Sequence, residues 1–125
     1  MMTDERDTVT TRSAREVFED HLRTAREWYF EEDIKRNFSE DCVVLIKDGV
    51  YRGHDGLIEL ANRLREEMPG ATFEYTTQGV EGDAAFLEWT AHSESVRVAD
   101  GADSFFVRDG LVVAQTIHYT VESLG

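Results

Sequence analysis

The alternation of apolar and polar positions divides the chain into a first part typical of helices and a second part typical of strands. From Ser13 apolar side chains recur at helical spacing as far as Tyr29, and Glu16 stands three residues after Ser13, as in a capping box. A short second helix is expected over the segment IKRNFSED, and a third over 53–68, which Pro69 ends. These stripes predict three helices packed on one core.

The strand pattern begins inside this helical part. The continuous apolar run 42–46 predicts a buried strand, and the turn at 47–49 returns the chain as a short strand over 50–52. From residue 71 onward, β-branched and aromatic residues alternate with polar ones, which predicts four further strands. Glycine and aspartate place turns at 98–101 and 108–110.

This order, two helices, a hairpin, a third helix and four strands, predicts an α+β fold. At 125 residues the chain has the length of one domain. We expect that domain over 13–125, preceded by a flexible, polar N-terminal tail over 1–12.

Charge narrows the possible partners. The formal net charge is −13, and residues 70–125 hold only two basic side chains, Arg97 and Arg108. Without a basic stripe, nucleic acid and anionic membrane surfaces are excluded as partners. The sequence has no apolar run long enough to span a bilayer and no apolar signal segment, so we expect a cytoplasmic protein.

The sequence contains no recognisable metal or cofactor motif. The single cysteine, Cys42, lies in an apolar run, which favours a small buried hydrophobe and excludes an intrachain disulfide or a cysteine cluster. His92, Asp103, Glu88 and His118 have suitable side chains, but their spacing matches no ligand signature. We therefore expect neither a metal nor a cofactor.

Three short motifs carry a resemblance to a known family. They are F-x-x-D before the first strand, Y-R-G before the third helix, and V-R-D-G-L-V-V in the last hairpin. In this order they resemble the nuclear transport factor 2-like superfamily, specifically its SnoaL-like domains, over residues 13–122. The resemblance implies a cystatin-like cone, in which a strongly curved mixed or antiparallel sheet wraps on three helices around an apolar pocket. It also implies dimers formed through the outer sheet face.

The superfamily includes ketosteroid isomerases, polyketide cyclases, scytalone dehydratase and limonene epoxide hydrolase. Matched to the steroid isomerases, Asp103 stands where those enzymes keep a protonated carboxylic acid that stabilises an oxyanion. Their base would fall near Ile46, and the aspartate of the cyclases near Ile117, and neither side chain can accept a proton. The resemblance therefore keeps one element of the known sites and lacks both bases.

The strand over 83–95 leaves two orientations open. Periodicity alone places Leu87 and Trp89 in the core, whereas the resemblance places Glu88 and His92 inside the cone and Trp89 on an outer face that a second subunit covers. We adopt the second orientation, because an exposed patch of Leu87 and Trp89 would form a partner surface.

With this orientation, His92 and Asp103 form a hypothetical proton-transfer pair. An apolar wall disfavours the ionised carboxyl, and imidazole titrates near neutral pH. The residues expected to line the pocket are Trp28, Tyr29, Phe86, Glu88, Phe105, Gln115, Ile117 and Tyr119.

Each candidate also has a structural interpretation. Asp103 would accept backbone N–H bonds at a turn around Gly101, and His92 would be an ordinary core or rim histidine. Glu88 would be exposed and paired with Arg97. His118 is expected on the outer face, and His21 is expected to be packed or at the cavity mouth.

Two functions follow from these alternatives. The first is a cofactor-independent isomerase, cyclase, dehydratase or hydrolase that acts by proton transfer on a small apolar or amphipathic carbonyl-like compound. The second is a non-catalytic ligand-binding or dimeric interaction module on the same scaffold. An enzyme needs polar groups that converge on a shared void, whereas a scaffold can fill that void with side chains.

Overall fold

A computed structural model describes residues 11–125. Its helices are α2 (Ala14–Arg26), α3 (Phe30–Asn37) and α4 (Gly53–Glu67). Its strands are β1 (Phe38–Ile46), β2 (Gly49–Arg52), β3 (Thr72–Glu81), β4 (Ala84–His92), β5 (Val96–Arg108), β6 (Leu111–His118) and β7 (Glu122–Ser123).

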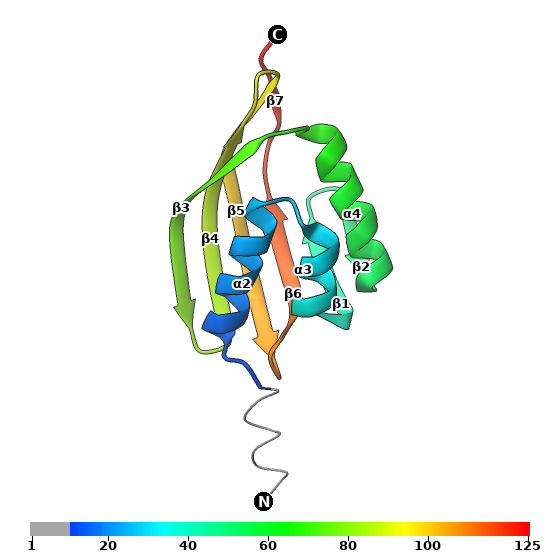
Figure 1. Ribbon diagram of the computed structural model, residues 1–125, viewed down its shortest axis with the longest axis vertical. Coiled ribbons are helices and arrows are strands. Elements are labelled where there is room, and N and C mark those ends of the chain that lie inside the picture. Colours follow the sequence, from blue (N-terminus) through cyan, green and yellow to red (C-terminus); the bar gives the residue numbers. More distant parts are fainter. Residues whose placement is uncertain (1–10) are drawn as a thin grey trace, which may run out of the picture.

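The strands form one mixed sheet in the order β2-β1-β6-β5-β4-β3, with the short β7 paired to β5. Only β1 and β6 run parallel, and the other pairs are antiparallel. The three helices lie against one face of this sheet (Figure 1). The predicted α+β fold, with three helices on a mixed sheet, is confirmed.

The first helix begins as the sequence predicts. Ser13 and Glu16 form both hydrogen bonds of a capping box, and the stripe with Val17, Phe18 and Leu22 is buried. The ring of Phe18 packs on that of Phe105 in β5, with 5.3 Å between the centroids. The capped end of α2 is therefore fixed on the central strands.

The predicted ends of the first two helices are wrong. The chain leaves α2 at Arg26, because Trp28 adopts a left-handed conformation (φ 64°) that no helix continues through. Its indole Nε1 donates to the Ala71 carbonyl oxygen at 2.8 Å, and its ring stacks on Phe73 at 5.0 Å. These contacts fix the sharp connection to α3, and the strand predicted from residue 42 already begins at Phe38.

The predicted turn at 98–101 is also wrong. Strand β5 continues through these residues, and the reversal between β4 and β5 lies at 93–95. A Cβ atom at Gly101 would lie 2.3 Å from ring atoms of Trp89, so this glycine makes room for an indole and does not form a turn. The ladder shifts register between Trp89 and Ala91, opposite this segment, which is the signature of a β-bulge.

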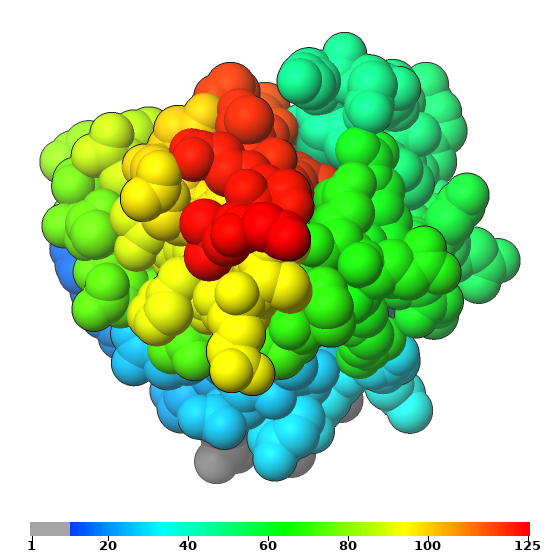
Figure 2. All heavy atoms as spheres, turned by 90° about the horizontal axis from the view of Figure 1, so that it is seen from above, coloured from blue at the N-terminus to red at the C-terminus, as the bar shows by residue number. Residues whose placement is uncertain are grey.

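The C-terminal residues close one end of the sheet. In Figure 2 they lie between the residues that begin β5 and the end of α4. The Leu124 amide donates to the Ser95 carbonyl oxygen at 2.9 Å, and Arg97 pairs with Glu122 at 2.8 Å. The predicted partnership of Arg97 with Glu88 is therefore wrong.

At the opposite end, the predicted tail over 1–12 lies almost entirely outside the described residues. Its last residue, Arg12, donates hydrogen bonds to the carbonyl oxygens of Arg36 and Gly110, at 3.0 Å and 2.9 Å. The chain is therefore anchored to the rest of the fold immediately before α2 begins.

Candidate functional site

A cavity with about 530 Å³ of empty space, counting its open mouth, lies between the helices and the inner face of the sheet. Its walls are mostly apolar. Polar groups come from His21 in α2, Asp103 in β5 and Gln115 in β6. The lining residues are His21, Leu22, Ala25, Phe30, Leu64, Met68, Phe73, Tyr75, Leu87, Trp89, Asp103, Gln115 and Ile117. The enclosed part of this space is about 80 Å³, so only a compact ligand fits without movement of the walls.

Asp103 is the buried carboxyl group of this cavity. Its Oδ1 accepts a hydrogen bond from Trp89 Nε1 at 2.9 Å, and its Oδ2 accepts one from Gln115 Nε2 at 3.1 Å. The register places Trp89 opposite Gly101, so the indole reaches diagonally to Asp103 across the strand pair. The expected alternative, in which Asp103 accepts backbone N–H bonds at a turn, is wrong.

The surroundings of Asp103 shift its titration towards neutral pH. Burial raises the pKa of Asp103 to about 6, because the desolvation of the charged form outweighs the opposing effects of both hydrogen bonds and of His21. Both direct donors, Trp89 and Gln115, are neutral, so no ion pair compensates the loss of water. Asp103 can therefore exchange a proton near pH 6 at little cost.

His21 enters the same cavity from α2. Its ring is buried edge-on between Phe38 and Phe105, at centroid distances of 5.6 Å and 5.0 Å. Its Nδ1 bonds to Asp33 Oδ2 at 2.7 Å. Burial would lower the pKa of His21, but the Asp33 charge and hydrogen bond outweigh it and raise that pKa above its ordinary value.

The other ring nitrogen of His21, Nε2, is not held by a bond of this kind. No described residue forms a hydrogen bond with Nε2, and among residues 11–125 no fully buried side-chain nitrogen or oxygen lacks a partner. Nε2 is therefore not a sealed and unpaired atom of the core. The ring lines this cavity and also a second hollow on the side of Asp33 and Leu57. Asp33 thus fixes one nitrogen and leaves the other available to a ligand.

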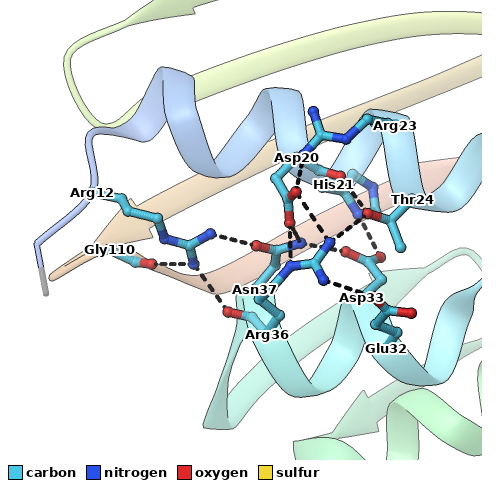
Figure 3. A network of polar contacts seen from close by, with 10 residues as sticks. All are labelled: Arg12, Asp20, His21, Arg23, Thr24, Glu32, Asp33, Arg36, Asn37 and Gly110. Atoms are coloured by element: carbon cyan, nitrogen blue, oxygen red, sulfur yellow. Dashed lines mark hydrogen bonds and ion pairs between the residues drawn. The ribbon is translucent and has the colours of Figure 1, made fainter. Parts of the chain in front are cut away.

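A hydrogen-bond network behind His21 holds Asp33 in place (Figure 3). Asn37, which is fully buried, donates through Nδ2 to Asp33 Oδ1 and to Asp20 Oδ2, both at 2.8 Å. Its Oδ1 accepts from Arg12 Nη1 at 2.8 Å, which fixes the orientation of the amide. The Asp33 carboxylate therefore has a partner on each oxygen and is held towards His21.

The sequence-based orientation of β4 is wrong. Leu87 and Trp89 are buried inside the single chain, whereas Glu88 and His92 are exposed on the opposite face. Simple alternation indicated this arrangement, and the family resemblance pointed to the opposite one. His92 lies at the end of β4 with its side chain away from the cavity, so the structure does not bring it together with Asp103.

The other expected lining residues divide into three groups. Gln115 and Ile117 line the cavity as expected. Phe105 and Tyr119 lie beside it, since Phe105 packs under His21 and the Tyr119 hydroxyl donates to Glu67 Oε1 at 2.5 Å beyond Trp89. Three further aromatic residues do not line it, because Trp28 packs behind Phe73 while Tyr29 and Phe86 are exposed.

Two expectations about the remaining histidines are confirmed. His118 is exposed on the outer face, where its Nε2 lies 3.3 Å from Asp100 Oδ2. His21 is packed and lines the cavity.

Sequence reasoning missed the partners of His21. The second helix was expected to begin after Asp33, yet Asp33 is buried in the first turn of α3. Asn37 was assigned to the second helix without a role. The available signal was two polar residues, Asp33 and Asn37, spaced four apart on the face of Ile34, which marks a polar patch on an otherwise buried helix face.

The described residues contain no group of three or more histidine, cysteine, aspartate or glutamate side chains placed to hold a metal ion. Cys42 is buried, and its burial raises the pKa of the thiol. Within residues 11–125, each helix is too short or too polar to cross a membrane.

Comparison with known proteins bears on this site. The chain is similar to the crystal structure of a candidate ketosteroid isomerase from Kribbella flavida (TM-score 0.72, 19% identity, 88% of this chain and 81% of that one). It is similar to an LEH-like epoxide hydrolase of M. tuberculosis (0.64, 22%, 88% and 84%). It also resembles a de novo designed protein with a curved β-sheet (0.70, 15%, 86% and 84%).

Identities this low establish the fold alone, as the designed relative makes clear. No curated protein matches the chain. The sequence model of the SnoaL-like domain, however, matches residues 14–115, which include α2, the buried carboxyl and most of the cavity wall. The chain therefore belongs to the SnoaL-like family, with a nuclear transport factor 2-like fold.

Proposed function

We propose that this protein catalyses a cofactor-independent proton transfer on a small, largely apolar compound with a carbonyl-type oxygen. Asp103 is the proton acceptor. The observation that carries the proposal is a buried carboxyl group in an apolar cavity, held by two neutral donors, whose burial raises its pKa to about 6. At pH 7 such a group is mainly ionised, yet it binds a proton far more readily than an exposed aspartate does.

The shape of the cavity limits the ligand class. Phe30, Phe73, Tyr75 and Trp89 supply aromatic walls, and their rings favour flat or cyclic apolar molecules. The polar groups of Asp103 and His21 then orient a single oxygen-bearing end. Relatives named as a candidate ketosteroid isomerase and an epoxide hydrolase agree with small-molecule chemistry in a pocket of this kind.

The proposal is tested with β,γ-unsaturated cyclic ketones, beginning with cyclohex-3-enone, whose conversion to the conjugated enone is followed by ultraviolet absorbance. Asp103→Asn is expected to reduce kcat/KM by about 10²- to 10⁴-fold, the usual contribution of a general base. The matched control is Asp83→Asn, since Asp83 is exposed in the turn before β4. This control should leave the rate unchanged.

Equal rates for the wild type and Asp103→Asn across the ketone panel would contradict the proposal. If the ketones then still bound, with the same affinity to both proteins, the second function would be favoured, namely a non-catalytic ligand-binding module. Tryptophan fluorescence reports binding directly, because Trp89 lines the cavity.

We further propose that a second copy of the chain covers the outer face of the sheet. Leu45, Phe86 and Phe106 are exposed there, with 47%, 42% and 48% of their surface accessible. The registers align them in two neighbouring rows across β1, β6, β5 and β4, and Val43 and Ala114 extend the row of Phe106. Thr116 and Ser104 stand between Leu45 and Phe86 in their row. Large exposed apolar side chains on one sheet face are typical of an isologous interface.

Trp89, which we expected at this interface, is buried in the single chain, so the two exposed phenylalanines take its place. Light scattering after size exclusion should show a dimer for the wild type and a monomer for Phe106→Glu. A monomeric wild type, or a variant with the same mass as a dimeric wild type, would contradict this assembly.

A further inference from the structure

One ring nitrogen of His21 is fixed by Asp33, and the other has no hydrogen-bond partner among the described residues. The four histidines of the chain differ in this respect. His92 and His118 are exposed, and His54 bonds to the Phe38 carbonyl oxygen through Nε2 at 2.8 Å. Only His21, among the described residues, combines a buried ring, a carboxylate partner and a place in the cavity wall.

We propose that His21 is a second catalytic residue, which donates a proton from Nε2 to the ligand oxygen while Asp103 removes a proton from the adjacent carbon. This inference rests on the proposed function and identifies the general acid of the proposed reaction. It also explains why a costly polar network lies behind an otherwise apolar wall, a network that the reaction of Asp103 alone does not require.

The network gives His21 one orientation. Asp33 accepts from Nδ1, so the ring cannot flip without losing a 2.7 Å bond, and Nε2 is left without a described partner on a ring that lines the cavity. Asn37 holds the second oxygen of Asp33, and Arg12 holds the amide of Asn37. Three consecutive contacts therefore connect the cavity wall to the start of the described chain, and each one restricts the next.

The charges around His21 favour the acid form. Three carboxylates act on the ring, namely Asp33 from α3, Asp103 from β5 and Asp20 from its own helix, and all of them raise the pKa of His21. The strands β3, β4 and β6 and the helix α4 add no charged group to the cavity wall, where the hydroxyl of Tyr75 is occupied by the Leu22 carbonyl oxygen. Asp103 is thus the base and His21 the acid between pH 6 and the raised pKa of His21.

The proton balance closes without a co-reactant. The Asp103 carboxylate takes a proton from the carbon between the carbonyl and the alkene, and Nε2–H of His21 gives its proton to the carbonyl oxygen. A neutral dienol forms between a protonated Asp103 and a neutral His21. The dienol then returns its O–H proton to Nε2, while Asp103 protonates the far carbon of the alkene. The product is the conjugated ketone, and both residues regain their starting states.

His21→Asn separates a catalytic from a structural role. An asparagine amide nitrogen can stand where Nδ1 stands and keep the bond to Asp33, but it presents nothing in the place of Nε2. We expect a loss of about 10²-fold or more in kcat for cyclohex-3-enone, with KM little changed, at a temperature where circular dichroism shows the variant to be folded. A variant as active as the wild type would overturn the assignment of His21 and leave that of Asp103 standing.

A nuclear magnetic resonance titration of the histidine ring nitrogens tests the charge state without any ligand. We expect His21 to titrate above about 6.5 in the wild type and below it in Asp33→Asn, where burial is no longer opposed. The matched control is Asp100→Asn, which removes the partner of the exposed His118 and should leave the His21 titration unchanged. A His21 pKa at or below the ordinary value in the wild type, or one unaffected by Asp33→Asn, would overturn the proposal.

The rate profile links the two experiments. In the wild type the alkaline limb for cyclohex-3-enone should follow the titration of His21, and in Asp33→Asn it should move to lower pH together with the ring. A wild type inactive on every ketone would remove the proposed reaction, and with it the acid role of His21, whatever the ring titration shows. An inactive Asp103→Asn beside a fully active His21→Asn would remove the acid role alone.

Discussion

The two polar groups of the cavity wall are held in opposite ways. Asp103 receives hydrogen bonds from the neutral side chains of Trp89 and Gln115, whereas His21 faces the charged Asp33. At Asp103, desolvation is the larger effect and raises the pKa of the carboxyl group. At His21, desolvation lowers the pKa, but the charge and hydrogen bond of Asp33 outweigh it, so the pKa of the imidazole also rises. The comparison teaches that the charge of the partner, and not burial alone, decides how a buried group titrates.

The largest effect is expected from removing the charged partner. Asp33→Leu should destabilise the protein by about 3 to 5 kcal/mol at pH 6, because it leaves a buried imidazolium unpaired and takes an acceptor from Asn37. Urea denaturation measures this loss, which should shrink above the pKa of His21, where the ring is neutral. The exposed pair His118–Asp100 is the control. His118→Leu, which leaves the two hydrogen bonds from Thr120 to Asp100 in place, should cost at most about 1 kcal/mol. Equal losses for the two variants would contradict the comparison.

Removing the charge of Asp103 should act in the opposite direction. A carboxyl group whose pKa is higher in the folded state stabilises the fold below its ordinary pKa of 3.8, and this contribution is lost as the pH rises to about 6. That rise corresponds to about 3 kcal/mol. Asp103→Asn, in which Gln115 can turn its amide to accept the new N–H, should therefore be more stable than the wild type at pH 8 by up to about 3 kcal/mol.

This gain should disappear below pH 4, where the wild-type carboxyl is protonated in the folded and unfolded states. Thermal denaturation at pH 4 and pH 8 measures both values. A variant less stable than the wild type at pH 8 would show that the hydrogen bonds of Asp103 outweigh its desolvation.

The next largest effect on stability is expected at Gly101, on which the Trp89 ring packs. Gly101→Ala places a methyl group 2.3 Å from the indole ring, so the ring must move, at a cost of about 1 to 3 kcal/mol. The displaced Nε1 then donates less well to Asp103, and the pKa of Asp103 should rise further. Gly79→Ala in β3 is the matched control, because nothing lies within 4 Å of its added methyl group. Chemical denaturation should show a loss for Gly101→Ala alone, and equal stability of the two variants would contradict this packing.

The smallest effect concerns the neutral donor from β6. Gln115→Leu keeps the apolar volume but removes the 3.1 Å bond to Asp103 Oδ2, and should raise the pKa of Asp103 by about one unit. The His21 ring titration should change little, because its charged partner Asp33 is untouched. A lower pKa of Asp103 in this variant would mean that Gln115 does not stabilise the ionised form.

The sequence was informative where structure is local. The capping box at Ser13 and the hairpin at 47–49 follow from neighbouring residues, and both formed as predicted. The residues near Gly101 were wrongly predicted to form a turn. Glycine and aspartate are common in turns, but here the glycine belongs to a bulged strand and makes room for an indole ring. The alternation of β4 indicated the correct side for Trp89. The family resemblance led us to place Glu88 and His92 inside instead, which is the wrong face of the strand.

The site depends on contacts that no local pattern contains. Asp103 was found through the resemblance, but its donors Trp89 and Gln115 come from two other strands whose registers had to be known. His21 and Asp33 are 12 residues apart on two helices, and the packing of α2 on α3 brings them together. The left-handed Trp28 that directs this packing is a rare conformation, and its sequence gives no sign of it.

The state of Asp103 in the ligand-free protein is the most direct test. A carbon-13 titration of the aspartate side-chain carboxyls, with the signal assigned through Asp103→Asn, gives the pKa of this group. The buried site with neutral donors predicts a midpoint of about 6. A midpoint at or below the ordinary value of 3.8 would contradict it, since a carboxyl that stays fully ionised at pH 6 has not lost its water.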